Sequence, residues 1–127
     1  RARRMVPIRE LLDRKIIVSA GSDWPSETNN PFAILQFYVT RKAEDGTVAG
    51  PEQKVSRQEA LRMATVNNAY LTFEEEVKGS LEPGKLADFL ILSADYLTVP
   101  EDEIEHIRPL ATYVGGRKMY AAAGSGF

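Results

Sequence analysis

Residues 16–25 constrain the fold more than any other part of the chain. The run Ile-Ile-Val at 16–18 shows no alternation of polar and apolar residues, which is typical of a strand covered on both faces in a parallel sheet. A Gly-Ser pair then favours a sharp turn, and Pro25 cannot simply continue a ladder. Functional groups gather just past the carboxyl ends of such strands. We therefore expect a buried strand that delivers Asp23 to the mouth of a site, although an Asx turn or a helix cap would also account for this carboxylate.

Three further segments predict helices from their start signals. A proline heads an amphipathic pattern at 7–14, where its missing N–H costs nothing. Asn30 has the character of an N-cap before Pro31, and the apolar pattern that follows runs to about residue 42. Ser56 and Glu59 have the spacing of a capping box, which predicts a helix to about residue 67 with a short helical turn after it.

The last third of the chain consists of turns and short strands. We expect a strand at 89–92 and a hairpin in which 112–114 pairs with 118–120 across two glycines. A Pro-Gly pair at 83–84 predicts a type II turn. One helical turn is expected at 100–104, between the strand and the hairpin.

Size and charge limit what the chain can do. Its 127 residues have the length of one domain, and 43% are hydrophobic, which is enough to bury a core. The net charge of −2 argues against binding to nucleic acid or to an anionic membrane surface. No apolar run approaches the length of a membrane span. The lack of cysteine fits a reducing compartment, so we expect a cytoplasmic protein.

One glycine-rich motif resembles a nucleotide site. Residues 79–85 match the Gly-x4-Gly-Lys core of a phosphate-binding loop. However, Leu86 stands where a hydroxyl would hold magnesium, and Glu82 places a negative charge where phosphates would lie. An acidic stretch, not a buried strand, precedes the motif. A turn therefore explains these residues better.

The chain lacks the residues for a metal site or a catalytic triad of its own. His106 is the only histidine, and zinc sites need three or four protein ligands at suitable spacing. We expect it to be a surface or interface histidine. Ser22 lies beside Asp23, but no neighbouring base could activate it, so it remains a plain hydroxyl.

Five motifs occur in the order found in one enzyme superfamily and run through nearly the whole chain. They are Gly-Ser-Asp-Trp-Pro at 21–25, Asn-Pro-Phe at 30–32, Val-Thr-Arg at 39–41, Ser-Arg-Gln-Glu-Ala-Leu at 56–61 and Gly-Ser-Leu-Glu-Pro-Gly-Lys-Leu-Ala-Asp at 79–88. With them the chain resembles the C-terminal part of amidohydrolase superfamily enzymes, in the amidohydrolase family 3 branch. The last motif is the most specific of the five.

The resemblance implies an incomplete α/β fold in two parts. Residues 1–75 would form the last strand-helix unit or units of a TIM-like metal-dependent hydrolase barrel. Residues 76–127 would supply the C-terminal strands of a small composite β-sandwich, with the acidic run 74–76 at the seam. A complete barrel needs roughly 200 residues or more, and the chain begins at Arg1 rather than Met. We therefore read it as a piece of a larger enzyme.

The resemblance also implies chemistry. Enzymes of this kind use one or two divalent metals, usually zinc, to hydrolyse amide-type carbon–nitrogen bonds of small molecules. Asp23 matches the carboxylate that binds metal and handles protons in the family, which makes it both the catalytic and the metal residue. Trp24, Thr28 and Asn30 are expected to shape the substrate pocket by their position. The family's remaining metal ligands lie outside this sequence, so we expect the isolated chain to be inactive and to bind little or no metal.

Two expectations concern partners. Strands left without their sandwich neighbours invite pairing with another copy, so we expect a homo-oligomer. We expect neither a nucleic-acid nor a membrane partner. A non-catalytic binding or assembly module built from the same piece of fold is the alternative to a hydrolase fragment.

Overall fold

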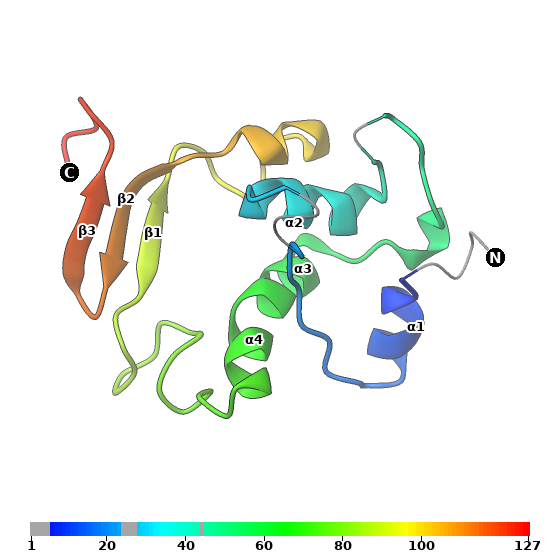
Figure 1. The fold of residues 1–127 in the computed structure, drawn as a ribbon, viewed down its shortest axis with the longest axis horizontal. Helices are drawn as coiled ribbons and strands as arrows, with labels where there is room; N and C mark the ends of the chain where they lie inside the picture. Colours follow the sequence, from blue (N-terminus) through cyan, green and yellow to red (C-terminus); the bar gives the residue numbers. More distant parts are fainter. Residues whose placement is uncertain (1–5, 24–27, 44) are drawn as a thin grey trace.

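Helices occupy the first part of the chain and a small sheet occupies the last. The computed structural model describes residues 6–23, 28–43 and 45–127. Its elements, in order (Figure 1), are α1 (Ile8–Asp13), α2 (Pro31–Thr40), the 3-10 helix η2 (Pro51–Gln53), α3 (Arg57–Ala64), α4 (Val66–Leu71), β1 (Phe89–Leu92), the 3-10 helix η3 (Glu101–His106), β2 (Pro109–Val114) and β3 (Arg117–Ala121). Across these ranges, no helix is long and apolar enough to cross a bilayer.

Helix α2 begins where the sequence predicts. The Phe32 N–H donates to the Asn30 side-chain oxygen at 3.1 Å, and Pro31 occupies the first helical position. An N-cap of this kind satisfies a backbone donor that the helix itself leaves without a partner. The helix ends at Arg41, which adopts a left-handed φ of 60°. The predicted start is confirmed, and the predicted end is within two residues.

The predicted capping box is also present, at the start of α3. The Glu59 N–H donates to Ser56 Oγ at 3.2 Å, and the Ser56 N–H donates to Glu59 Oε2 at 2.8 Å. The predicted single helix to about 67 is in fact two helices, since Thr65 leaves helical geometry with φ −124° and ψ −94°. Helix α4 therefore starts at Val66 and carries Asn67 and Asn68.

The three strands form one antiparallel sheet in the order β1-β2-β3. The predicted strand and hairpin are confirmed, and β2 pairs with β3 across Gly115 and Gly116, whose φ values of 55° and 77° a type I′ turn requires. Phe89 and Tyr113 stack across β1 and β2, with ring centroids 4.5 Å apart. Every residue of β3 is exposed.

The turn before this sheet rules out a phosphate-binding loop. The Lys85 N–H donates to the Glu82 carbonyl at 3.1 Å, and Gly84 at the third turn position has φ 93°. These are features of a type II turn, as predicted. The chain then enters β1 and not a helix, so no helix N-terminus is available for phosphates.

The main core joins the helices to the segment that precedes β2. Apolar side chains of α2 and α3 form one buried cluster with residues from 96 to 107, and η3 packs along α2 (Figure 1). The buried members are Ile8, Phe32, Leu35, Val39, Val55, Ala60, Met63, Tyr96, Ile104 and Ile107. The Arg57 guanidinium donates to the Tyr96 carbonyl at 2.6 Å and also to the Val99 carbonyl. The predicted division between residues 75 and 76 stays a prediction, and this core includes residues from both sides of it.

The predicted buried strand at 16–18 is wrong. Residues 16–20 have no regular secondary structure, and Ile16 and Ile17 are 47% and 52% exposed. A strand requires a neighbouring backbone with which to exchange hydrogen bonds. All three strands of the described chain lie in the antiparallel sheet, so this apolar run has no parallel neighbour there. An apolar sequence without such a neighbour stays extended and partly exposed.

The buried hydroxyl of Tyr96 makes the stability of this core dependent on pH. Burial raises the pKa of Tyr96 to about 12, although the nearby Arg57 charge acts in the opposite direction. The folded-state pKa exceeds the ordinary value near 10, so the stabilisation is complete below pH 10 and is lost as the pH rises towards 12. We expect the free energy of unfolding, measured in urea, to fall between pH 10 and 12, with Tyr96 contributing about 2 kcal/mol to the fall.

Tyr96→Phe isolates this contribution. The variant loses the hydrogen bond from the Tyr96 hydroxyl to the Arg57 carbonyl, so it should be about 1 kcal/mol less stable at pH 8 but should lose less stability above pH 10. Tyr70→Phe, at a tyrosine that is 47% exposed, should keep the wild-type profile. If the free energy of unfolding fell with pH equally in Tyr96→Phe and the wild type, the pH dependence would not come from Tyr96.

Candidate functional site

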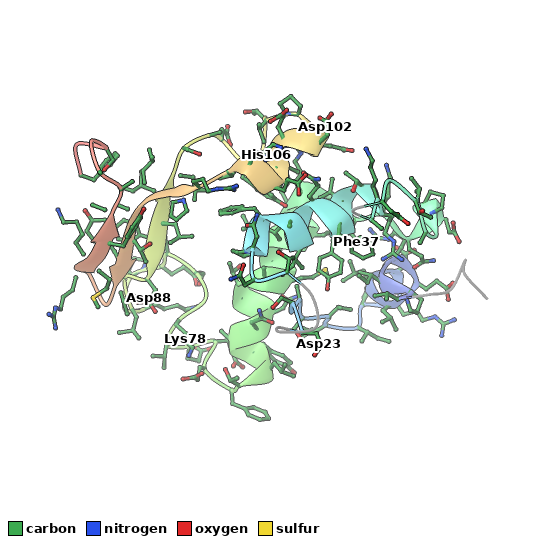
Figure 2. The ribbon with its side chains drawn as sticks, turned by 45° about the horizontal axis from the view of Figure 1, so that its top comes forward. Asp23, Phe37, Lys78, Asp88, Asp102 and His106 are labelled. Atoms are coloured by element: carbon green, nitrogen blue, oxygen red, sulfur yellow. The ribbon has the colours of Figure 1, made fainter. Side chains whose placement is uncertain are left out.

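Asp23 lies at the end of the extended segment that follows α1. Its side chain is exposed and its backbone has a left-handed φ of 53°. Few residues other than glycine adopt this conformation, although aspartate does so more readily than most, and such outliers are enriched at functional sites. Figure 2 shows Asp23 on the opposite side of α2 from Asp102 and His106.

The backbone just before Asp23 is held by helices on two sides. The Ala20 N–H donates to the Met63 carbonyl at 3.0 Å, at the end of α3. The backbone of Gly21 hydrogen-bonds the Tyr38 hydroxyl from α2. Burial raises the pKa of Tyr38, and the Gly21 hydrogen bond and the Arg41 charge oppose this rise. Tyr38 is therefore a neutral hydroxyl at ordinary pH that serves as a hydrogen-bond partner.

The predicted pocket residues have structural roles where they are described. Thr28 Oγ1 accepts from the Asn30 N–H at 3.0 Å. The Asn30 side chain caps α2 and donates to the Glu105 carbonyl at 2.9 Å, which ties α2 to η3. Trp24 lies outside the described residues. The prediction that these three residues contact substrate stays a prediction.

The donor groups of the described chain do not gather into a metal site. Among residues 6–23, 28–43 and 45–127, no three His, Asp or Glu side chains lie close enough to hold one ion. His106 is exposed, as predicted, and Figure 2 shows it well separated from Asp23 and Asp88. A catalytic zinc needs about three protein ligands. The described residues by themselves therefore do not fit such a metal, whereas Asp23 fits as one oxygen donor.

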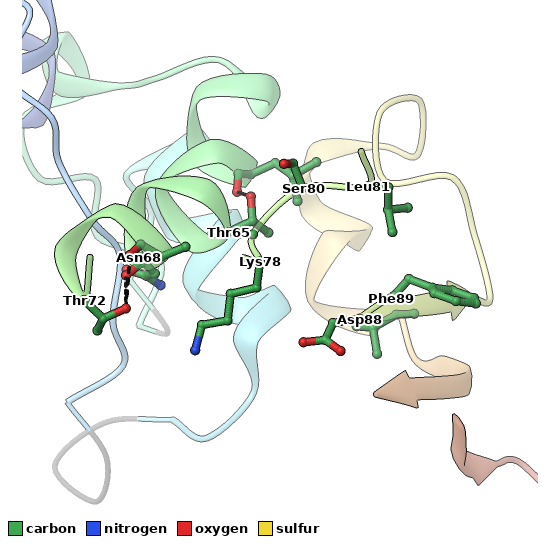
Figure 3. A pocket seen from close by; sticks show the side chains of 12 residues that line it. Thr65, Asn68, Thr72, Lys78, Ser80, Leu81, Asp88 and Phe89 are labelled. Carbon is green, nitrogen blue, oxygen red and sulfur yellow. Dashed lines mark hydrogen bonds between the residues drawn. The ribbon is translucent and has the colours of Figure 1, made fainter. Parts of the chain in front are cut away.

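A cleft of about 760 Å³ separates α3 and α4 from the start of the sheet (Figure 3). Its walls combine apolar side chains with a few polar groups, and Lys78 forms an ion pair with Glu74 at 2.7 Å. The lining residues are Leu61, Thr65, Asn68, Ala69, Thr72, Lys78, Gly79, Ser80, Leu81, Asp88, Phe89 and Leu90. Asp23 is not among them, so this cleft and the predicted carboxylate are distinct features.

A smaller hollow of about 520 Å³ lies between the start of α2 and the start of β2. Asn30 and Phe32 line it from one side, and Ile107 and Arg108 line it from the other. Asn30 is a predicted pocket residue, and it borders this hollow.

Sequence reasoning missed the residues that hold the Asp23 segment, namely Asn67 and Asn68 of α4. Their side-chain amides donate to the Val18 carbonyl at 2.8 Å and to the Ala20 carbonyl at 3.0 Å. Asparagine is a poor helix former, so two in succession inside a helix were a signal that their side chains bind elsewhere.

The sequence model of the amidohydrolase family matches residues 1–120. This match covers almost the whole chain. The chain belongs to the amidohydrolase family. The resemblance stated from the five motifs is confirmed.

The curated relatives include two enzymes that match most of this chain. An N-substituted formamide deformylase of Arthrobacter pascens is 35% identical over 122 residues, which cover 96% of this chain and 22% of the relative. A 5-methylthioadenosine/S-adenosylhomocysteine deaminase of Thermoanaerobacter pseudethanolicus is 35% identical over 92 residues, which cover 70% of this chain and 20% of the relative. The chain thus spans about a fifth of the length of these relatives. Both names describe hydrolases that act on carbon–nitrogen bonds.

A solved structure shares the fold. The amidohydrolase of Thermotoga maritima MSB8 superposes with a TM-score of 0.68 over 91% of this chain and 26% of its own, at 19% sequence identity. The amidohydrolase chain described here is a small α/β fragment with a three-stranded antiparallel sheet. Its assignment to the end of a TIM barrel and to a β-sandwich remains a prediction.

Proposed function

We propose that this chain is the C-terminal part of a metal-dependent hydrolase that cleaves a carbon–nitrogen bond of a small amide-type molecule. The observation that carries the proposal is the family match over residues 1–120, which includes Asp23 within its Gly-Ser-Asp motif. The carbon–nitrogen hydrolases among its relatives support the class of reaction.

Asp23 is the residue of this chain that takes part in the chemistry. Its carboxylate would be one oxygen ligand of a divalent metal, zinc by family resemblance, and the remaining ligands would come from residues outside the described chain. Such a metal supplies Lewis acidity to the reaction when bound. The carboxylate can accept a proton from the attacking water and pass it to the leaving nitrogen, which is general base and then general acid catalysis.

The substrate proposal follows from the relatives. The deformylase acts on N-substituted formamides by name, so these small amides are the first compounds to test. Trp24, Thr28 and Asn30 would contact the substrate beside the carboxylate. Purine nucleosides, by analogy with the deaminase, form the second set.

Asp23→Asn tests the role of the carboxylate in a complete enzyme that contains this chain together with the remaining metal ligands. The substitution keeps the shape of the side chain but removes its charge and its basicity. We expect kcat/KM for the best formamide to fall by about 10³-fold or more, since proton transfer alone is worth 10²–10⁴-fold. Steady-state hydrolysis, followed by release of the amine, measures this loss.

Asp102→Asn is the matched control, because Asp102 is an exposed carboxylate on the far side of α2 (Figure 2). It should retain wild-type turnover. Full activity of Asp23→Asn would overturn the proposed role.

A titration with zinc tests how much of the metal site this chain carries. A single carboxylate holds a catalytic metal poorly, because the number and geometry of ligands set the affinity. We therefore expect calorimetry on the 127-residue chain to show only weak binding, with no one-to-one transition in the micromolar range, and we expect no hydrolysis by the chain alone. Tight one-to-one binding that Asp23→Asn abolishes would contradict this expectation.

The second candidate function is a non-catalytic binding or assembly module. The exposed apolar side chains of the described chain favour it, and Leu71, Phe73 and Leu81 are 65%, 91% and 72% exposed. The sequence upstream of Arg1 separates the two candidates: a His-x-His segment there supports the hydrolase. An open reading frame without one, together with full function of Asp23→Asn, supports the module.

We also propose that the chain self-associates through its sheet. Strand β3 is an edge strand, and Met119 and Tyr120 on it are 62% and 49% exposed. Unpaired edges with apolar side chains favour pairing with another copy. Light scattering should give a mass above that of the monomer at high concentration, and Met119→Lys should lower it because a charge on the edge opposes pairing. Leu97→Lys, at a residue outside the sheet, should not. A monomeric mass at all concentrations would contradict the proposal.

A further inference from the structure

The segment that leads to Asp23 is held by side chains in place of a neighbouring strand. Asn67 Nδ2 donates to the Val18 carbonyl at 2.8 Å, and Asn68 Nδ2 donates to the Ala20 carbonyl at 3.0 Å. The Ala20 N–H adds a third hydrogen bond, to the Met63 carbonyl at the end of α3. The blue segment accordingly runs beside the green helices in Figures 1 and 2.

The two sides of the segment are held by different helices. In an extended chain, the backbone groups of alternate residues point to the same side. Val18 and Ala20 therefore present their carbonyls to α4, while Gly21 presents its backbone to Tyr38 of α2. These contacts end two residues before Asp23, so they fix the point from which its carboxylate projects.

Asn68 is the best placed of these residues. Its amide also donates to the Ala64 carbonyl at 3.3 Å, one helical turn earlier, and this second bond fixes the orientation of the side chain. Both acceptors are carbonyl oxygens, so only a hydrogen-bond donor suits the position. Alanine would form a better helix by roughly half a kcal/mol, which means that the asparagine serves the contact and not the helix.

We infer that Asn68 is a positioning residue for Asp23, acting through the Ala20 carbonyl with support from Asn67 and Tyr38. This inference rests on the proposed function, because it assigns Asn68 a part in placing the proposed catalytic carboxylate. Asn68 itself touches neither substrate nor metal. Its effect on the reaction is to limit the positions that the Asp23 carboxylate can take.

The first test measures the segment directly in the 127-residue chain. Asn68→Ala removes the donor, and amide hydrogen exchange followed by NMR should speed up roughly fivefold at Ala20 and Gly21, as expected for the loss of about one hydrogen bond. Gln58→Ala, at an exposed position of α3, is the matched control and should leave these amides unchanged. Exchange at Ile104 in the core should be the same in all three proteins.

Asn68→Asp separates a lost donor from a general loss of packing. At neutral pH the new carboxylate would face two carbonyl oxygens, so exchange relative to wild type should exceed that of Asn68→Ala. Below the pKa of the new carboxyl group, the protonated form can donate a hydrogen bond. The exchange rate of Asn68→Asp relative to wild type should therefore be lower there than at neutral pH. Two results would overturn the positioning role of Asn68: an exchange rate of Asn68→Asp relative to wild type that does not change with pH, or an exchange rate of Asn68→Ala equal to that of wild type.

The second test measures the consequence for turnover in the same complete enzyme that is used for Asp23→Asn. We expect Asn68→Ala to lower kcat by roughly 10- to 100-fold with KM changed less than twofold, because a misplaced catalytic group loses rate and not substrate binding. Asn68→Gln, which keeps an amide donor, should recover part of the loss.

The outcomes distinguish the two proposals. If Asp23→Asn leaves turnover intact, the proposed function fails, whatever the exchange data show. If Asp23→Asn abolishes turnover while Asn68→Ala retains wild-type kcat, the positioning role fails and the proposed function stands.

Discussion

The packing of η3 on α2 is the contact on which the rest of the structure depends. It joins residues about 70 positions apart into one core, and apolar burial of this kind supplies most of the stabilisation. Because that burial has no direction, polar bonds fix the orientation: Asn30 donates to the Glu105 carbonyl, and the Glu105 N–H donates to the Gln36 side chain, both at 2.9 Å. The core thereby places α2, α3 and α4 around the segment that carries Asp23.

That segment shows what happens to a strand-like sequence without a strand beside it. Buried carbonyl groups must find donors, and here helix side chains supply them at Val18 and Ala20. Ile16 and Ile17 remain half exposed. The chain spans about a fifth of the length of the two curated relatives described above.

The proposed chemistry requires a carboxylate that is shielded from water. A carboxylate acts strongly on a reacting group only where water is excluded, because electrostatic interactions weaken in a medium of high dielectric constant. Asp23 is exposed in this chain, and the described residues provide no cluster of metal ligands around it. In the proposed function, this chain would contribute the Asp23 carboxylate on a backbone that is held as far as Ala20, and other segments would have to exclude water around it.

Local signals in the sequence determined the local structure. The cap at Asn30, the capping box of Ser56 and Glu59 and the glycine turn of the hairpin each depend on residues within a few positions, so the sequence alone predicts them, and its motifs identify the family. The tertiary structure decided the rest. It left the run at 16–18 without a neighbour, broke one predicted helix at Thr65 and brought Asn68 to the Ala20 carbonyl. The last of these outcomes depends on a contact between residues 48 positions apart, which no local pattern encodes.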